Sequence, residues 1–461
     1  MPPVLRFFSS SRRRIRLRDA SRRCARDSSG NFTILFAFAA PVLILFLGMG
    51  IDYWVGLSDK SRMDTAADAA AIAAVNGAKA FFAANSGPMS GTALSNAAIA
   101  AGIVLGDKAF AADMGSTLLV QSVTPAITMT YSDLTFTSSV HWSGQAPTHF
   151  GPLVGISNIA ISGSAAATAS LPKYLDFYVV VDTSGSMGIP TSAADQRLLM
   201  ASNPDNAIEQ ANGYMGGCQF ACHFVGYGGF NYTQANNLPL KLNSVGSAVQ
   251  ALLTTATTTK VINNQYRVGI YPFIENAIQA ASLSADFTTA NSVAGNLAYY
   301  LDQGTTNGGM GSGGTHFETL WPDVSPYMQT AGTGASASST SPFIILVTDG
   351  VDNNQIYTPA KQSWTGSQPQ TPSATFCTNA KSAGYTVAVL LIPYVPIVDP
   401  EHIWNDEDYV VNSLIGANSI SPAMQSCAST GYFFSAATAA DINNAMLTIF
   451  YQAIGSARLT Q

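Results

Sequence analysis

The sequence predicts an α/β protein with a doubly wound, mostly parallel sheet, preceded by one transmembrane helix and a small α+β region. Two short apolar runs, Phe177–Val181 and Phe343–Val347, are rich in β-branched and aromatic residues and each leads to a carboxylate. Such runs are typical of strands buried on both faces. Helical segments alternate with further apolar runs, which is the pattern of a parallel sheet covered by helices.

The N-terminal segment predicts a membrane anchor. Residues 1–30 hold nine of the 21 basic and two of the 27 acidic residues, and an apolar run follows from Phe32 to Ile51. About 20 such residues cross a bilayer as a helix. Arginines before the run and an aspartate after it orient the helix, predicted at 31–56, with its N-terminus in the cytoplasm. A twin-arginine signal and a cleaved signal peptide are the disfavoured alternatives, because further arginines intervene and the run is long.

The region 57–170 is expected to combine a helix with a small strand-rich unit. An Ala-rich stretch from Ser58 to Phe82 favours a helix that continues the membrane segment. From residue 98 to 170 the composition changes to Thr, Val, Ile and Ser. Alternating patterns there predict strands at 118–123, 127–131, 134–140 and 159–167. His141 and His149 are expected to be surface or packing residues.

The region 172–461 carries the alternating strands and helices. The helix expected after the first buried strand appears only at Leu240–Thr255, so residues 189–237 form an insertion. This insertion is either a specificity or gating element or a decorative loop. The rest of the region predicts strands at 266–273, 277–281, 385–392 and 431–434, and helices at 290–301, 374–383 and 437–457.

Polar side chains gather where the two buried strands end. Asp182, Ser184 and Ser186 follow the first strand, Asp349 follows the second, and Thr315 lies in a glycine-rich loop. In open α/β sheets, ligands bind at the carboxyl ends of the strands. Carboxylates and hydroxyls are hard oxygen donors that suit Mg²⁺ or Mn²⁺. A structural turn that binds no metal is the alternative.

This order of residues, D-x-S-x-S, then Thr, then T-D-G, resembles the metal-ion-dependent adhesion site of a von Willebrand factor A domain. The resemblance implies a Rossmann-like fold for 172–461. It also implies that Ser184, Ser186 and Thr315 coordinate the metal, with Asp182 and Asp349 bound directly or through water. A carboxylate from a protein partner would complete the coordination shell.

A second resemblance concerns the N-terminus. The stretch G-N-F-T-I-L-F-A from Gly30, followed by G-I-D-Y from Gly50, resembles TadE/TadG-like Flp pilus-assembly proteins. Pilin-like members are cut after a glycine and carry Glu five residues later. Here that position is Leu35, so the segment is interpreted as a permanent anchor.

Together the two resemblances imply a membrane-anchored, non-enzymatic component of bacterial Tad/Flp pilus assembly or adhesion. The anchor would lie in the inner membrane and the A domain in the periplasm, where pilus or pilus-assembly components are candidate partners. A regulatory or chaperone-like A-domain protein of the cell envelope, unrelated to pili, is the alternative. The whole chain has a net charge of −6, and the part after the basic residues 1–30 is more acidic still. This charge argues against nucleic-acid binding by that part.

The predicted topology leaves Cys24 in the cytoplasm and four cysteines outside, where disulfides persist. Cys218 and Cys222 are expected to pair with each other, and Cys377 with Cys427. The second bridge would stabilise the fold by about 4 kcal/mol in the chain-entropy model. Metal binding by Cys218, Cys222 and His223 is the rival interpretation, which lacks a nearby fourth ligand.

The sequence does not predict catalysis. Gly309, Gly311 and Gly314 match the dinucleotide-binding fingerprint in spacing, but they do not follow a strand. Ser184 and Ser186 have no adjacent base to activate them as nucleophiles, and the five histidines form no triad-like group.

Overall fold

The computed structural model divides the chain into two compact units. The first comprises residues 1–81, 91–131 and 135–169, and the second comprises 82–90, 132–134 and 170–461. Within these, the structure describes residues 30–115, 120–207, 219, 228–302, 310, 313–358, 363–365, 369–397 and 407–456.

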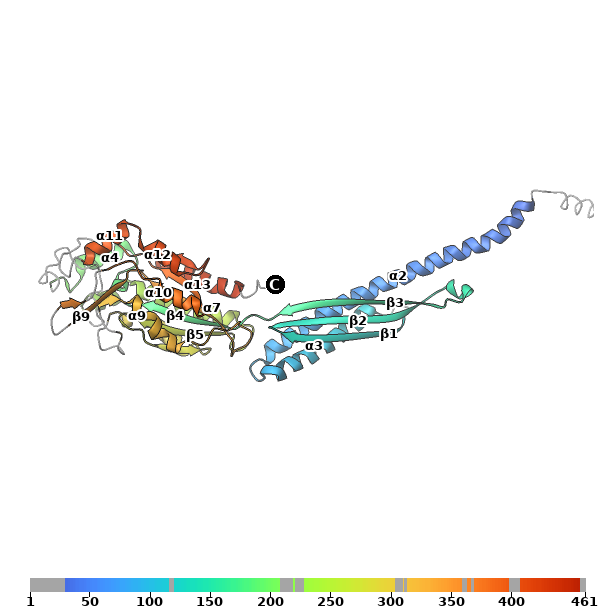
Figure 1. Ribbon diagram of the computed structural model, residues 1–461, viewed down its shortest axis with the longest axis horizontal. Helices are drawn as coiled ribbons and strands as arrows, with labels where there is room; N and C mark the ends of the chain where they lie inside the picture. The colour runs from blue at the N-terminus through green and yellow to red at the C-terminus, as the bar shows by residue number, and fades with distance from the viewer. Residues whose placement is uncertain are drawn as a thin grey trace, which may run out of the picture. The chain divides into compact units, whose positions relative to one another are not determined.

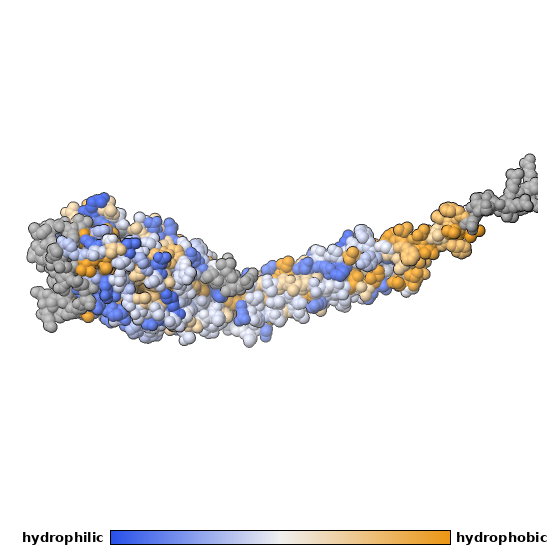
Figure 2. Space-filling model, turned by 45° about the horizontal axis from the view of Figure 1, so that its top comes forward, coloured by the Kyte–Doolittle hydropathy of each residue, from blue (hydrophilic) through white to orange (hydrophobic). Residues whose placement is uncertain are grey.

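The first unit begins with one long helix, α2 (Gly30–Asn85), in which the apolar run and the Ala-rich stretch are continuous. Of the helices that the structure describes, α2 alone is long and apolar enough to cross a membrane. Its apolar half is almost entirely exposed and forms the orange stretch in Figure 2. One face of its Ala-rich half is buried by the rest of the unit, with Met63, Ala66 and Ala70 wholly covered.

A three-stranded sheet packs on this half of α2. Its strands, in the order β1-β2-β3, are β1 (Gln121–Ser132), β2 (Thr135–Pro147) and β3 (Asn158–Ser170). The sheet lies along this half of α2 (Figure 1). It contributes Val140, Trp142 and Ile161 to the shared core. The two strands expected at 118–123 and 127–131 are one strand, β1, in the structure.

The expectation of strands from residue 98 onward is wrong for its first part. Residues 91–114 form a second helix, α3 (Gly91–Met114), in which Ala98, Gly102 and Gly106 recur on one buried face. An added Cβ at Gly102 would lie 2.5 Å from the backbone oxygen of Ala74 in α2. Small residues at every fourth position therefore let the two helices approach closely.

The second unit contains a six-stranded sheet in the order β12-β11-β8-β4-β5-β6. Every pairing within it is parallel except that of β6, so the predicted α/β class with a mostly parallel sheet is confirmed. The strands are β4 (Leu175–Asp182), β5 (Tyr266–Phe273), β6 (Ala281–Ser284), β8 (Ser341–Thr348), β11 (Thr386–Leu391) and β12 (Phe433–Ser435).

Helices cover both faces of this sheet, and the side chains of β4 alternate between them. Phe177 and Val179 belong to the core shared with α7 (Lys241–Thr259), α8 (Thr288–Gly295) and α13 (Ala439–Ser456). Tyr178 and Val180 belong to the core on the other face, shared with α9 (Phe317–Val324), α10 (Thr375–Ser382) and α12 (Ile420–Cys427). Burial on both faces explains why β4 is apolar at nearly every position. The helix α11 (Glu407–Gly416) precedes α12 in the chain.

The two ends of the insertion lie side by side. The backbone N–H of Thr191 donates to Pro239 O at 3.0 Å, and that of Lys241 donates to Ile189 O at 2.9 Å. Between these contacts lie α4 (Ala193–Ser202) and α6 (Gly228–Ala235). As a result, α7 begins directly beside the end of β4. Cys218, Cys222 and His223 lie outside the described residues, so their pairing stays a prediction.

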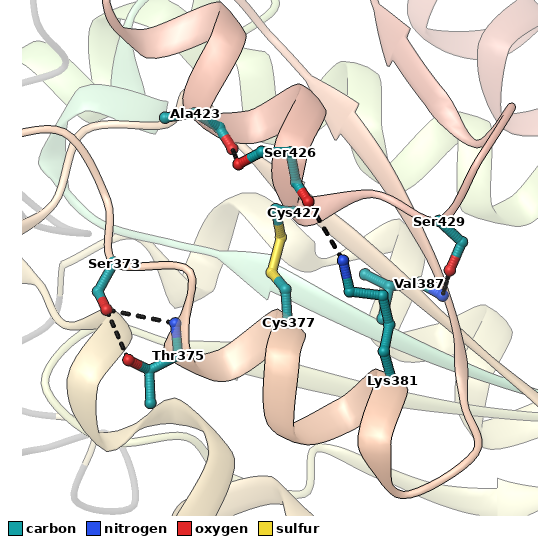
Figure 3. The surroundings of a disulfide bond; sticks show 9 residues. All are labelled: Ser373, Thr375, Cys377, Lys381, Val387, Ala423, Ser426, Cys427 and Ser429. Atoms are coloured by element: carbon teal, nitrogen blue, oxygen red, sulfur yellow. Dashed lines mark hydrogen bonds between the residues drawn. A yellow bond between two sulfur atoms is a disulfide. The ribbon is translucent and has the colours of Figure 1, made fainter.

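A disulfide joins Cys377 in α10 to Cys427 at the end of α12, with 5.2 Å between the Cα atoms (Figure 3). Lys381 Nζ, one turn after Cys377, donates to Ser426 O at 3.2 Å. The bond closes a loop of 50 residues that contains β11. It therefore ties two helices together on one face of the sheet.

Replacing both cysteines, Cys377→Ala with Cys427→Ala, should lower the free energy of unfolding by about 2–4 kcal/mol, because the unfolded chain regains the entropy of that loop. Hydrogen exchange of the full chain in detergent measures this at the amides of α10, β11 and α12. The reduced wild type is the matched control. Unchanged protection in all three elements would contradict the prediction.

Candidate metal centre

The two predicted carboxylates lie at the ends of neighbouring strands. In the parallel pair β4–β8, Val181 lies opposite Val347, so each strand reaches its polar end at the same edge of the sheet. The hydroxyl of Thr348 crosses to the other strand and donates to Asp182 Oδ2 at 2.7 Å. Asp349 follows immediately, and both aspartates are completely buried.

The turn after β4 folds its hydroxyls back onto Asp182. Asp182 Oδ1 accepts from both the backbone N–H and the hydroxyl of Ser184, at 3.0 and 2.6 Å. The hydroxyls of Ser184 and Ser186 are 3.2 Å apart. A short 3₁₀ turn, Gly185–Gly188, produces this arrangement. The structure thus brings together the three D-x-S-x-S residues that the sequence singled out.

Thr315 belongs to a separate small sheet. It ends β7 (Gly313–Thr315), which pairs with β9 (Asn353–Thr358), and β9 also pairs with β10 (Ser363–Thr365). Only glycine fits at position 314, since a Cβ there would lie 1.7 Å from Asn353 O. Asp302 links β7 to the turn after β4: its backbone N–H donates to Thr183 O at 3.0 Å, and its Oδ1 accepts from the N–H of Gly313 at 3.3 Å.

Asp349 has one oxygen paired and one unpaired. Its Oδ2 accepts from Nζ of Lys241, the first residue of α7, at 3.0 Å. Its Oδ1 is buried and has no hydrogen-bond partner among the described residues. A buried carboxylate oxygen without a partner is costly, and a missing ion is one explanation for such a group. Lys241 is only 2% exposed, and its ammonium group also lies 4.9 Å from the ring centre of Tyr394.

Burial and like charge both act on the aspartate pair. Burial, followed by the nearby carboxylate of Asp349, raises the pKa of Asp182 above its ordinary value of 3.8. Hydrogen bonds from Ser184 and Thr348 oppose this shift only in part. With both aspartates ionised, Lys241 leaves the site with one net negative charge. A divalent cation would reverse that sign and remove the repulsion between the carboxylates.

The donor set fits a hard divalent cation. Two carboxylates and three hydroxyls supply oxygen ligands alone, as Mg²⁺ and Mn²⁺ prefer. Among the residues that the structure describes, at this site or elsewhere, no group of three His, Cys, Asp or Glu residues could hold a metal, so a metal here would rely on hydroxyl ligands beside the two carboxylates.

Lys241 and Asp302 are the site residues that the sequence did not reveal. Lys241 is 108 positions from its carboxylate partner and follows the insertion, so no local spacing connects them. Asp302 precedes the glycine-rich loop and is not distinguished in the sequence from other polar loop residues. It links Thr183 to Gly313, and this role depends on the tertiary structure.

The comparisons with known proteins concern different parts of the chain. Residues 30–80 match the sequence model of the family described as putative Flp pilus-assembly TadE/G-like. No curated protein matches the chain in sequence.

Among solved structures, the pilus adhesin SpaC from Lactobacillus rhamnosus GG is similar at 14% identity and a TM-score of 0.34. The alignment covers 72% of this chain and 35% of SpaC, so this chain spans about a third of that protein. The vWF domain of the type V pili tip protein Mfa5 from Porphyromonas gingivalis is 11% identical, with a TM-score of 0.35. The alignment covers 63% of this chain and 99% of that domain. Proximal thread matrix protein 1 from the mussel byssus, solved with a zinc-occupied MIDAS motif, is 13% identical, with a TM-score of 0.33. The alignment covers 61% of this chain and 48% of that protein. These TM-scores are too low to transfer structural detail from one protein to another.

Without metal, the free energy of unfolding should fall as the pH rises from about 4, because the folded protein holds the Asp182 proton to a higher pH than the unfolded chain does. Each unit of pKa difference corresponds to about 1.4 kcal/mol. Asp182→Asn should lack this contribution and gain stability relative to wild type at high pH. Denaturation of both proteins in chelator at a series of pH values above about 4 measures the difference. An unfolding free energy that changes with pH equally in both proteins would contradict the prediction.

Lys241→Met should destabilise the metal-free protein by about 3–5 kcal/mol, because it leaves the buried Asp349 carboxylate without its counter-charge. Lys260→Met, at an exposed position just after the same helix, is the matched control and should have little effect. Adding Asp349→Asn to Lys241→Met should recover part of the loss. Equal stability of the two lysine variants in chelator would show that the ion pair is unimportant.

Proposed function

We propose that residues 172–461 form a von Willebrand factor A domain with a doubly wound, Rossmann-like fold and an insertion at 189–237. In this proposal, Ser184, Ser186 and Thr315 hold Mg²⁺ or Mn²⁺ together with Asp182 and Asp349, directly or through water. The observation that carries the proposal is the unpartnered Oδ1 of Asp349, buried beside a second carboxylate and a chain of hydroxyls.

When bound, the metal would supply a positive centre that accepts a further oxygen ligand. The chain's own residues prepare for this: Thr348 and Ser184 hold Asp182 in place by hydrogen bonds, and Lys241 holds Asp349. A carboxylate from a protein partner is a ligand of the right hardness and charge. The site would then act in adhesion or assembly and carry out no reaction.

We further propose that the protein is a membrane-anchored component of a bacterial Tad/Flp pilus system. Residues 1–30 would lie in the cytoplasm, 31–56 in the inner membrane, and 57–461 in the periplasm. The apolar half of α2 and the match of residues 30–80 to the TadE/G-like family support this placement. The same match favours a pilus role over a regulatory or chaperone-like A-domain protein.

The metal proposal is tested by calorimetric titration of Mg²⁺ and Mn²⁺ into the full chain in detergent. Wild type should bind one ion, and Asp182→Ala or Ser184→Ala should weaken binding about 10- to 100-fold, since each removes an oxygen that binds the metal or supports its ligands. Thr191→Ala, at a hydroxyl that donates to Pro239 O at the base of the insertion, is the matched control. Equal affinity in all four proteins would refute the assigned ligands.

The pilus role is tested with the same variants in cells. Ser184→Ala as the sole copy should abolish piliation or pilus-dependent adhesion, while the protein remains in the inner membrane. Thr191→Ala should leave both unchanged. Normal piliation and adhesion in cells that lack the whole protein would favour the regulatory alternative.

A further inference from the structure

We propose that the loop between β2 and β3, residues 148–157, inserts its apolar side chains into the lipid bilayer beside α2. This inference rests on the proposed anchoring of α2 in the membrane. It adds a second membrane contact, made by a segment about 100 residues further along the chain. The loop lies at the same end of its unit as the apolar half of α2 (Figure 1).

Asp52 attaches this loop to α2. It follows the apolar run directly, and its carboxylate accepts the backbone N–H groups of His149, Phe150 and Gly151, each at 2.8 Å. The side chain of Asp52 is almost fully buried by these contacts. Three hydrogen bonds to one carboxylate are charge-assisted and fix the loop against the helix.

The loop reaches into the apolar stretch itself. The ring of Phe150 covers Gly48, one helical turn before Asp52, where an added Cβ would lie 2.4 Å from Phe150 Cγ. The four residues from Gly48 to Asp52 correspond to about 6 Å along the helix axis. Phe150 therefore lies at the depth of residues predicted to be in the hydrocarbon region.

The loop also presents apolar side chains outward. Leu153 is 75% exposed, and Val154 and Ile156 are each nearly half exposed. Tyr53 and Trp54 on α2, next to Asp52, are about two-thirds exposed, as expected for aromatic residues at a membrane boundary. No charged residue occurs in the loop apart from the titratable His149. This surface is suited to the boundary between headgroups and acyl chains.

The loop holds this shape through its own hydrogen bonds. A 3₁₀ turn, Gly151–Val154, is closed by the N–H of Gly155, which has φ +82°. The N–H of Ile156 donates to Gly151 O at 2.9 Å, and the Thr148 hydroxyl donates to Ile156 O. These hydrogen bonds hold Leu153 and its apolar neighbours on the outside of the turn. A lipid bilayer can accept such side chains without a surface of complementary shape.

The test places the photo-reactive amino acid p-benzoylphenylalanine at single positions of the full chain in vesicles of phosphatidylethanolamine and phosphatidylglycerol. The positions are Leu153 in the loop, Leu43 in the apolar run, and Thr130 near the opposite end of the sheet, all exposed. Mass spectrometry after illumination identifies lipid or protein adducts. We expect lipid adducts at Leu153 and Leu43 and essentially none at Thr130.

The three positions separate the possible failures. Lipid adducts at Leu43 without any at Leu153 would overturn the loop contact and leave the anchor intact. An absence of lipid adducts at both would overturn the proposed membrane anchoring, and the loop contact with it. Protein adducts in place of lipid adducts at Leu153 would show that the loop contacts a neighbouring protein chain. Lipid adducts at Thr130 in the same yield as at Leu153 would show that the labelling is unspecific. Either result would overturn the inference.

A second variant tests the attachment by Asp52. Asp52→Ala removes the acceptor of three backbone N–H groups and should reduce the lipid adducts at Leu153 several-fold, with the Leu43 adducts unchanged. Equal adduct yields at Leu153 with and without this substitution would overturn the role of Asp52.

Discussion

The parallel pairing of β4 with β8 is the constraint on which the candidate site depends. It brings Asp182 and Asp349 to the same edge of the sheet, both completely buried. Two carboxylates in such a place repel each other and lose their hydration, so their ionised forms are stable only with positive charge or hydrogen-bond donors close by. The hydroxyls of Thr348 and Ser184 and the ammonium group of Lys241 meet part of this need. A divalent cation would meet the rest.

The groups that complete the site come from distant parts of the chain. Lys241 reaches Asp349 because the two ends of the insertion are hydrogen-bonded to each other, so that α7 begins beside the end of β4. Asp302 joins the strand of Thr315 to the turn after β4, and Gly314 allows that strand to lie against β9. The backbone hydrogen bonds across the base of the insertion therefore fix where α7 begins.

The sequence predicted the sheet well because β4 and β8 are buried on both faces and have few polar residues before their ends. The structure also brings Asp182, Ser184 and Ser186 together, as their local spacing indicates, while the metal that they would hold stays a prediction. It failed at α3, where residues from 98 onward were expected to form strands, because close helix packing uses small residues that give little hydrophobic periodicity. It missed Lys241 and Asp302 because their partners depend on tertiary pairing, which no spacing along the chain reveals.

The most direct test of this account is the anomalous scattering of Mn²⁺ in crystals of the full chain grown with that ion. The account predicts one strong peak at the ends of β4 and β8, about 2.0–2.2 Å from oxygen ligands, as for other small hard cations. The hydroxyls of Ser184 and Ser186 should be among those ligands. Crystals with Mn²⁺ bound elsewhere, and with the Asp349 oxygen instead paired to a protein group, would contradict it.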